Sequence, residues 1–167
     1  MSHQTVIVLD FGGQYNQLIA RRVRECNVYC EVMPCTTPLS QLKAMDPIGI
    51  IFTGGPNSVY LDSSPHVDPE IFTWGVPILG ICYGCQLMAH TLGGQVTEAQ
   101  DDSAREYGKT QTYYDTTSPL FKGLPQEGIS WMSHGDYMAK VPEGFALTAH
   151  SDACPNVAIA DEKRGFY

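Results

Sequence analysis

Short apolar runs alternate with segments of helical periodicity along the first half of the chain. The expected strands cover residues 5–9, 28–33, 48–52 and 77–81. The expected helices cover residues 14–25, 40–45, 69–74 and 84–92, with Ser40 as the cap of the second helix. The first of these helices carries Leu18, Ile19 and Val23 on one face. Strands that are apolar throughout are typical of a parallel sheet covered on both faces.

The pattern changes from Gln95 onward. Shorter runs that contain Tyr and Thr, such as residues 109–114, indicate antiparallel and more exposed strands. No internal repeat, low-complexity tract or linker divides the chain. We therefore predict one α/β domain over residues 1–167: an open, mostly parallel sheet with helices on both faces, plus a small antiparallel C-terminal sheet.

Composition and charge narrow the function classes. Apolar residues make up 43% of the chain and charged residues 17%, which fits a folded domain and not a disordered one. The formal net charge of −8 repels phosphate backbones, so we expect no nucleic-acid partner. No apolar stretch is long enough to span a membrane. Residues Met1 to Gln4 show no features of a secretory signal, so we expect a cytoplasmic location in which the six cysteines are free thiols.

The pattern Gly-x-Cys-x-Gly, formed by Gly80, Cys82 and Gly84, lies between a predicted strand and a predicted helix. This is the cysteine form of a nucleophile elbow. The sharp turn lifts the sulfur above the carboxyl edge of the sheet, and the helix N-terminus favours thiolate over thiol. A Cβ on either glycine would collide with neighbouring backbone. The N–H of Tyr83 would face an oxyanion, and Gly55, after the third strand, could supply a second donor.

Three other interpretations of Cys82 remain open on the residues alone. The first is a buried cysteine that serves only packing. The second is a redox pair, because Cys82 and Cys85 form a Cys-x-x-Cys motif at a helix start. The third is a zinc site from Cys82, Cys85 and His90, for which the sequence offers no fourth ligand nearby.

Seven stretches, in one order over nearly the whole chain, carry a resemblance to a known family. They are residues 10–15, 18–25, 28–31, 53–56, 80–84, 131–136 and 161–164. On them the chain resembles the class I glutamine amidotransferases, the triad type with a Cys-His-Glu active site, and within them the glutaminase domains of GMP synthases. The elbow is typical of the wider family. The N-terminal stretch and the Ser-His-Gly-Asp loop narrow the resemblance to the glutaminase domains of GMP synthases. The resemblance implies a flavodoxin-like parallel sheet.

The resemblance also implies a reaction and its residues. A Cys82 thiolate attacks the side-chain amide of glutamine, a thioester forms, ammonia leaves and water releases glutamate. Gly55 and Tyr83 supply the oxyanion-hole amides. The residues that the resemblance assigns to glutamine binding are Gln86, Ser133, His134, Gly135 and Asp136. On the residues alone, the loop from Ser133 to Asp136 can also be read as a simple polar turn.

Partners and cofactors follow from the same resemblance. Ammonia would pass to an ATP-dependent synthetase domain or subunit that binds adenylylated XMP. We expect no cofactor and no metal in this domain, and ATP and Mg²⁺ only at the partner site. A non-catalytic glutamine-binding module remains an alternative function.

The chain departs from the family pattern at the catalytic base. The family's His and Glu lie in a His-Pro-Glu motif a few residues after the segment matched here by residues 162–167, and residues 1–167 contain neither. His134 belongs to the substrate loop in the resemblance and is not taken as the base. General acid–base help is worth roughly 10²–10⁴-fold. We therefore expect the chain as given to have little or no glutaminase activity.

Overall fold

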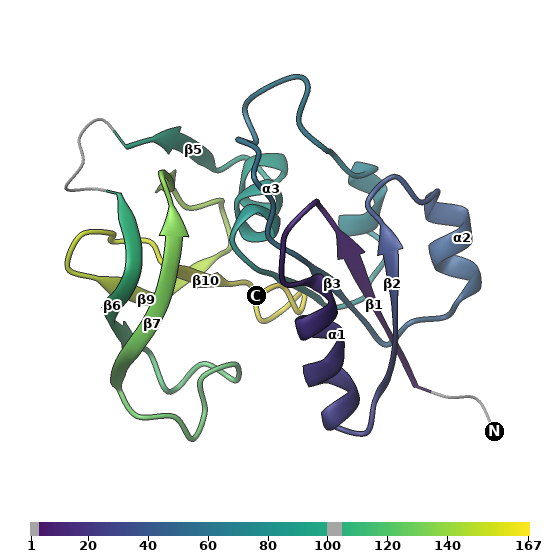
Figure 1. Cartoon of the computed structure of the whole chain (residues 1–167), viewed down its shortest axis with the longest axis horizontal. Coiled ribbons are helices and arrows are strands. Elements are labelled where there is room, and N and C mark those ends of the chain that lie inside the picture. The colour runs from purple at the N-terminus through teal and green to yellow at the C-terminus, as the bar shows by residue number, and fades with distance from the viewer. Residues whose placement is uncertain (1–3, 100–104) are drawn as a thin grey trace.

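A four-stranded parallel sheet, in the order β2-β1-β3-β4, forms the N-terminal half of the computed structural model (Figure 1). Its strands are β1 (Thr5–Asp10), β2 (Tyr29–Pro34), β3 (Gly49–Phe52) and β4 (Ile78–Gly80). All three pairings are parallel, as the continuous apolar runs predict. The structure describes residues 4–99 and 105–167, so Met1 to His3, part of the segment read for a secretory signal, lie outside it.

The helices follow the predicted order with small shifts. They are α1 (Asn16–Glu25), α2 (Leu39–Ala44), the 3-10 helix η1 (Pro69–Phe72) and α3 (Tyr83–Thr91). The prediction that Ser40 caps the second helix is wrong: Pro38 occupies the cap position and Ser40 lies inside α2. Pro38 fits there because its fixed φ suits a helix start and its missing N–H has no partner to lose.

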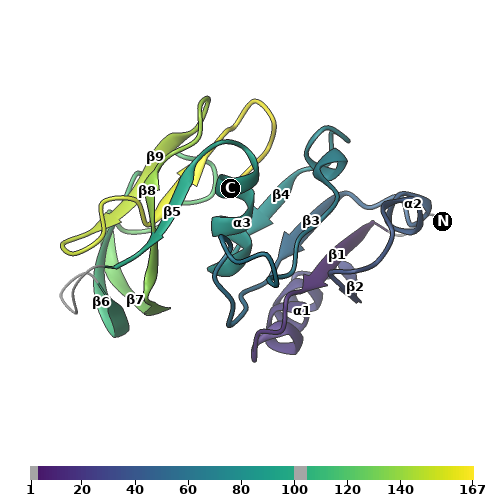
Figure 2. The same cartoon turned by 90° about the horizontal axis from the view of Figure 1, so that it is seen from above.

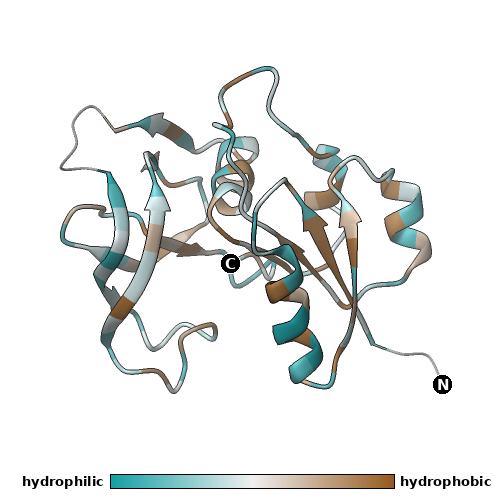
Figure 3. Ribbon diagram, viewed as in Figure 1, coloured by the Kyte–Doolittle hydropathy of each residue, from teal (hydrophilic) through white to brown (hydrophobic). Residues whose placement is uncertain are grey.

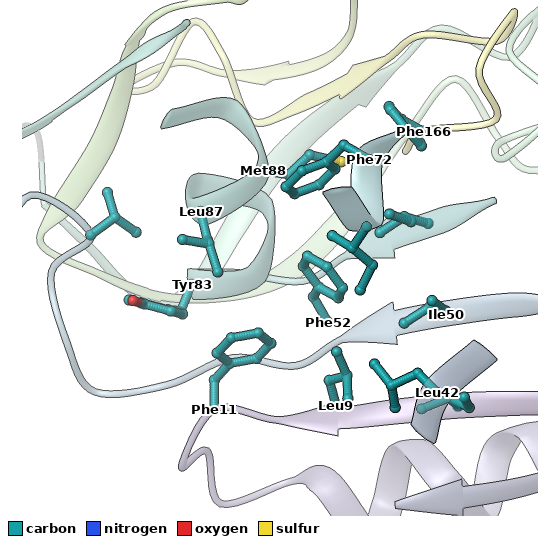
Figure 4. Close-up of a cluster of buried hydrophobic side chains, with 14 of the residues drawn as sticks. Leu9, Phe11, Leu42, Ile50, Phe52, Phe72, Tyr83, Leu87, Met88 and Phe166 are labelled. Carbon is teal, nitrogen blue, oxygen red and sulfur yellow. The ribbon is translucent and has the colours of Figure 1, made fainter. Parts of the chain in front are cut away.

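The two faces of the parallel sheet are covered by different helices. Figure 2 shows α1 and α2 on opposite sides of the strands. On the α1 side, the Cys30 thiol donates to the Ala20 carbonyl at 3.3 Å, and both residues are buried. The other side carries the main core, where Figure 4 shows Leu9, Phe52 and Leu87 packed together. The predicted covering of both faces is therefore confirmed.

Aromatic side chains join the main core to the start of α3. The ring of Phe11 lies 5.5 Å from that of Phe52 and 5.6 Å from that of Tyr83, measured between centroids. Tilted rings at such distances pack favourably. Figure 3 shows the apolar colour concentrated on β1, while much of α1 is polar. The start of α3 is thus anchored in the main core through Tyr83.

The C-terminal half forms two antiparallel sheets, one of four strands in the order β10-β9-β6-β7 and one of β5 with β8. Their strands are β5 (Gln95–Glu98), β6 (Glu106–Tyr114), β7 (Glu127–His134), β8 (Asp136–Lys140), β9 (Ala146–Ser151) and β10 (Ala158–Ala160). The predicted antiparallel character is confirmed. The four-stranded sheet has as many strands as the parallel one, so the C-terminal part is less small than expected.

The last described residues return to the parallel sheet. The Gly80 N–H donates to the Tyr167 carbonyl at 2.8 Å, and the Tyr167 N–H to the Ile78 carbonyl at 2.9 Å. Phe166 faces Ile78 in a parallel bridge and is 1% exposed. Residues 165–167 thus extend the sheet beyond β4, a pairing that the sequence did not reveal. Among the described residues, no helix is long and apolar enough to cross a membrane.

Candidate active site

Cys82 stands at a sharp bend between β4 and α3. Its backbone has φ 53° and ψ −113°. A residue other than glycine rarely adopts a positive φ, and the strain persists only where the surrounding structure enforces it. Hydrogen bonds hold both sides of the bend. The Ile81 N–H donates to the Phe52 carbonyl at 2.9 Å, and the Gly84 N–H donates to the Thr53 carbonyl at 3.1 Å.

The two glycines around Cys82 are required by close backbone approach. A Cβ on Gly80 would lie 2.6 Å from Cα of Cys85. A Cβ on Gly84 would lie 2.5 Å from both Cβ and the carbonyl oxygen of Phe52. Neither backbone can move away without disturbing the sheet or the helix. The collision predicted from the Gly-x-Cys-x-Gly pattern is therefore confirmed.

The glycine loop after β3 lies beside the sulfur because β3 and β4 are parallel neighbours. A Cβ on Gly54 would lie 3.5 Å from Cβ of Cys82 and 4.0 Å from its sulfur. The backbone of Gly55 packs against the turn that follows β1, where an added Cβ would lie 2.4 Å from the Phe11 carbonyl oxygen. The predicted neighbourhood of the Gly55 loop and Cys82 is confirmed.

Two hollows, of about 210 Å³ and about 340 Å³, meet at Cys82. Five predicted site residues line both, namely Cys82, Gln86, Ser133, His134 and Asp136. Gly55 and Gly135 line the larger hollow. Tyr83 lies apart: its side chain is buried, and its hydroxyl donates to the Pro65 carbonyl at 2.5 Å. Tyr83 can therefore contribute to the site only through its backbone.

The Ser133–Asp136 loop of the sequence analysis comprises the last two residues of β7, Gly135 and the first residue of β8. It is fastened from several sides. The side-chain amide of Gln86 donates to the Asp136 carbonyl at 3.0 Å. The Ala99 N–H donates to the Gly135 carbonyl at 2.8 Å. The Tyr60 hydroxyl donates to a carboxylate oxygen of Asp136 at 3.1 Å. Gln86 thus links the elbow helix to the loop, and the loop is held close to Cys82.

The surroundings of Cys82 raise the pKa of its thiol. Solvent reaches the residue, but protein crowds the sulfur, and this desolvation is the largest cause of the rise. The Tyr83 N–H lowers the pKa by hydrogen bonding to the thiolate, and the Asp136 carboxylate raises it again. The sequence predicts that the helix start favours the thiolate. That influence is present, but desolvation outweighs it.

Cys85 gives little support to the redox and zinc interpretations. Burial raises the pKa of its thiol to about 12, and the neighbouring Cys82 adds to the rise. Thiol–disulfide exchange needs an accessible thiolate, which such a group does not provide at neutral pH. Among residues 4–99 and 105–167, no three His, Cys, Asp or Glu side chains are gathered as metal ligands.

Several residues of the site carry no motif that sequence reasoning recognised. Asn156 and Val157 line the smaller hollow, and Tyr107 lines the larger. Glu106, 5% exposed at its side chain, contacts His134, with 3.1 Å between Oε2 and Nε2. One signal was available for Glu106. The period-two alternation of β6, read back from the buried Thr112, places Glu106 on the inward face.

Comparisons with known proteins agree with one another. A family model described as glutamine amidotransferase class-I matches residues 7–167. The chain is 57% identical over 162 residues to "GMP synthase [glutamine-hydrolyzing]" of Clostridium perfringens, covering 97% of this chain and 31% of that protein. It is also 57% identical over 167 residues to the protein of the same name from Caldicellulosiruptor saccharolyticus, covering 100% of this chain and 32% of that one. The chain thus spans about a third of the length of these relatives.

Solved structures match the fold over the whole chain. A protein from Thermoplasma acidophilum, described as a candidate GMP synthase subunit, superposes with a TM-score of 0.86 at 29% identity, covering 100% of this chain and 82% of that one. A glutamine amidotransferase from Thermotoga maritima superposes with a TM-score of 0.77 at 19% identity, covering 99% of this chain and 74% of that one. At that identity the second match supports the fold alone.

Proposed function

The chain belongs to the class-I glutamine amidotransferase family, and we propose from this membership that it is the glutaminase part of a GMP synthase. The observation that carries the proposal is the strained Cys82, which stands where two hollows meet and faces the Gly54-Gly55 loop. Packing alone gives a cysteine no reason to adopt such a backbone. A nucleophile presented to a small substrate does require it.

In the proposed reaction, the Cys82 sulfur attacks the side-chain carbonyl carbon of glutamine. The carbon–nitrogen bond then breaks, and the nitrogen takes up a proton and leaves as ammonia. Water hydrolyses the γ-glutamyl thioester and restores the thiol, so that glutamate is released. The N–H groups of Gly55 and Tyr83 stabilise the negative oxygen of each tetrahedral intermediate. In support, Gly55 lines the larger hollow together with Cys82, and the adjacent Gly54 lies beside the Cys82 side chain.

We assign glutamine binding to the residues shared by the two hollows. Asp136 carries a carboxylate near enough to Cys82 to raise the pKa of its thiol. Such a group suits the α-ammonium of the substrate. Gln86 and the backbone of Ser133–Asp136 form the wall between the elbow helix and β7. The polar groups of this wall can bind the charged α-amino and α-carboxylate groups of an amino acid, and this supports the assignment.

The general base is the part of the site that the described residues do not supply. Of the histidines they contain, only His134 lines the hollows, and its ring is engaged with Glu106. In the family pattern, a His-Pro-Glu motif comes shortly after the segment matched by residues 162–167. Tyr167 pairs with β4 beside Gly80. A motif that continued from this strand would emerge at the same sheet edge as Cys82.

The ammonia produced would serve an ATP-dependent synthetase domain or subunit that aminates XMP to GMP. The names of the relatives support this role, and those proteins are about three times as long as this chain. We place ATP and Mg²⁺ at that partner site and no cofactor in this domain. A location in the cytoplasm fits a free thiol nucleophile.

A chloroketone analogue of glutamine tests the proposal directly. The analogue should alkylate Cys82, forming a thioether and releasing chloride, with a rate that saturates with its concentration and falls when glutamine is added. Peptide mass mapping should find the label on Cys82 and not on Cys85. Cys82→Ser should abolish labelling, and Cys85→Ser should retain it. Labelling that survives Cys82→Ser, or that glutamine does not slow, would refute the proposed site.

A further inference from the structure

Glu106 is a buried carboxylate that the proposed reaction does not use. It begins β6 and stands opposite His134 of β7 in the antiparallel ladder. Its side chain is 5% exposed, and that of His134 is 16% exposed. Burial of a carboxylate is costly unless specific partners hold it. The partners of Glu106 therefore indicate what the residue does.

One oxygen of Glu106 is held by β9. The Ser151 hydroxyl donates to Oε1 at 2.5 Å, and the Cys154 N–H donates to the same hydroxyl at 2.9 Å. A second bond closes the turn after β9, from the Ser151 N–H to the Cys154 carbonyl at 2.8 Å. These contacts join β6 to β9 and fix the carboxylate in one orientation. The anchor is buried, and its Cys154 also lines the smaller hollow at Cys82.

The other oxygen faces His134. Oε2 lies 3.1 Å from Nε2, and no hydrogen-bond partner is found for Oε2 or for the His134 Nδ1 in the described part of the chain. The ring nitrogen nearest a carboxylate is the one that carries a proton. The contact at 3.1 Å is therefore electrostatic: it favours a proton on Nε2 and draws the ring toward the anchored carboxylate. Because His134 belongs to the loop that lines both hollows, the loop is held with it.

We propose that Glu106 is a positioning residue for glutamine binding, which acts through His134 to set the Ser133–Asp136 loop beside Cys82. This inference rests on the proposed glutamine site. The chain of contacts runs from Ser151 through Glu106 to His134 and so ties three strands of one sheet to the substrate loop. Glu106 does not touch the reacting atoms, so its effect is on affinity for glutamine.

The variant Glu106→Gln is the sharpest test. The amide oxygen can keep the Ser151 bond, but the NH₂ group then faces His134 and selects the opposite ring form. The half-saturating concentration of the glutamine chloroketone for Cys82 should rise roughly tenfold, the usual loss for one charge-assisted contact. The labelling rate at saturation and the alkylation of Cys82 by iodoacetamide should stay unchanged, because the sulfur itself is untouched.

The matched control is Glu127→Gln, the same chemical change at an exposed glutamate on β7. It should leave the half-saturating concentration unchanged. In a His134→Asn background, Glu106→Gln should have no further effect, since its route to the loop is gone. If Glu106→Gln fails to fold, Ser151→Ala takes its place. That variant frees Oε1 and should raise the half-saturating concentration to a smaller extent.

The outcomes separate this inference from the proposed function. Saturable labelling of the unaltered protein with an unchanged half-saturating concentration in Glu106→Gln, or in folded Ser151→Ala, overturns the positioning role. If Glu106→Gln raises the half-saturating concentration equally in the unaltered protein and in His134→Asn, the proposed route through His134 is overturned. Labelling of the unaltered protein that does not saturate overturns the glutamine site itself, whatever the variants do.

Discussion

At the scale of single residues, Thr53 connects three segments of the N-terminal half beside Cys82. It is completely buried, and its hydroxyl accepts the Phe11 N–H at 3.1 Å and donates to the Gly54 carbonyl at 3.1 Å. Its own carbonyl accepts the Gly84 N–H at the elbow. A single side chain thus fixes the turn after β1, the loop of Gly55 and the start of α3 relative to each other.

This arrangement predicts that Thr53→Val is much more harmful than Thr53→Ser. Valine keeps the shape but leaves the buried Phe11 N–H without an acceptor, which costs about 1–3 kcal/mol of unfolding free energy. Chemical denaturation should show that loss, and the saturated rate of Cys82 labelling by the chloroketone should fall. Serine keeps the hydroxyl and should retain that rate. Equal saturated rates in the two variants would contradict the connecting role.

At the scale of elements, the turn from β4 to α3 presents Cys82. The bend is strained at one residue and compensated by the core on either side, where Phe11, Phe52 and Tyr83 pack together. The helix start lowers the pKa of the Cys82 thiol and desolvation raises it, with desolvation the stronger. The elbow therefore contributes position and orientation more than acidity, so the proposed nucleophile requires a partner base.

The elbow predicts a sharp difference between two glycine substitutions. In Gly84→Ala the new Cβ would lie 2.5 Å from Phe52, so the helix start must shift; overpacking of this kind costs about 1–3 kcal/mol. In Gly49→Ala the nearest atom is the Pro77 carbonyl oxygen at 3.8 Å, an ordinary contact. Thermal unfolding should show a lower Tm for Gly84→Ala, together with slower Cys82 labelling. Gly49→Ala should keep the labelling rate.

At the scale of the whole molecule, the site lies where the parallel sheet meets the antiparallel strands. The elbow and the Gly55 loop come from the first part, and the Ser133–Asp136 loop comes from the second (Figure 1). Residues 165–167 return from the second part to pair with β4. Each half alone lacks one wall of the hollows, so the two parts function together.

The same architecture predicts how residues 1–167 behave when assayed by themselves. These residues should bind the chloroketone, which should then alkylate Cys82, because the walls of both hollows and the Cys82 sulfur are present. Steady hydrolysis of glutamine should be slower by roughly 10²–10⁴-fold than in a polypeptide that also carries the family's His-Pro-Glu motif, because no base assists proton transfer. Ammonia release is the measurement. Equal turnover by the two polypeptides would show that another group, with His134 the nearest choice, acts as the base.

Much of the molecule could be predicted from the sequence because its causes are local. Apolar runs specify strands covered on both faces, and the Gly-x-Cys-x-Gly spacing specifies an elbow whose glycines have no room for a Cβ. These features depend on residues that are near one another in the chain. The sequence therefore predicted the order of the strands and helices, and it placed the elbow and the Gly55 loop at the same edge of the sheet. The prediction that Ser40 caps the second helix was wrong, because the helix already starts after Pro38, two residues earlier.

Other features depend on contacts between residues distant in sequence, and only the tertiary structure decided them. The pairing of residues 165–167 with β4, the link from Ser151 through Glu106 to His134, and the use of Gln86 to hold the Asp136 carbonyl all join separate segments. The raised pKa of Cys82 has the same origin, because desolvation depends on every atom packed around the sulfur. The sequence alone determined the sharp bend at Cys82; the fold decided what surrounds it, since burial and long-range pairing are properties of the packed chain.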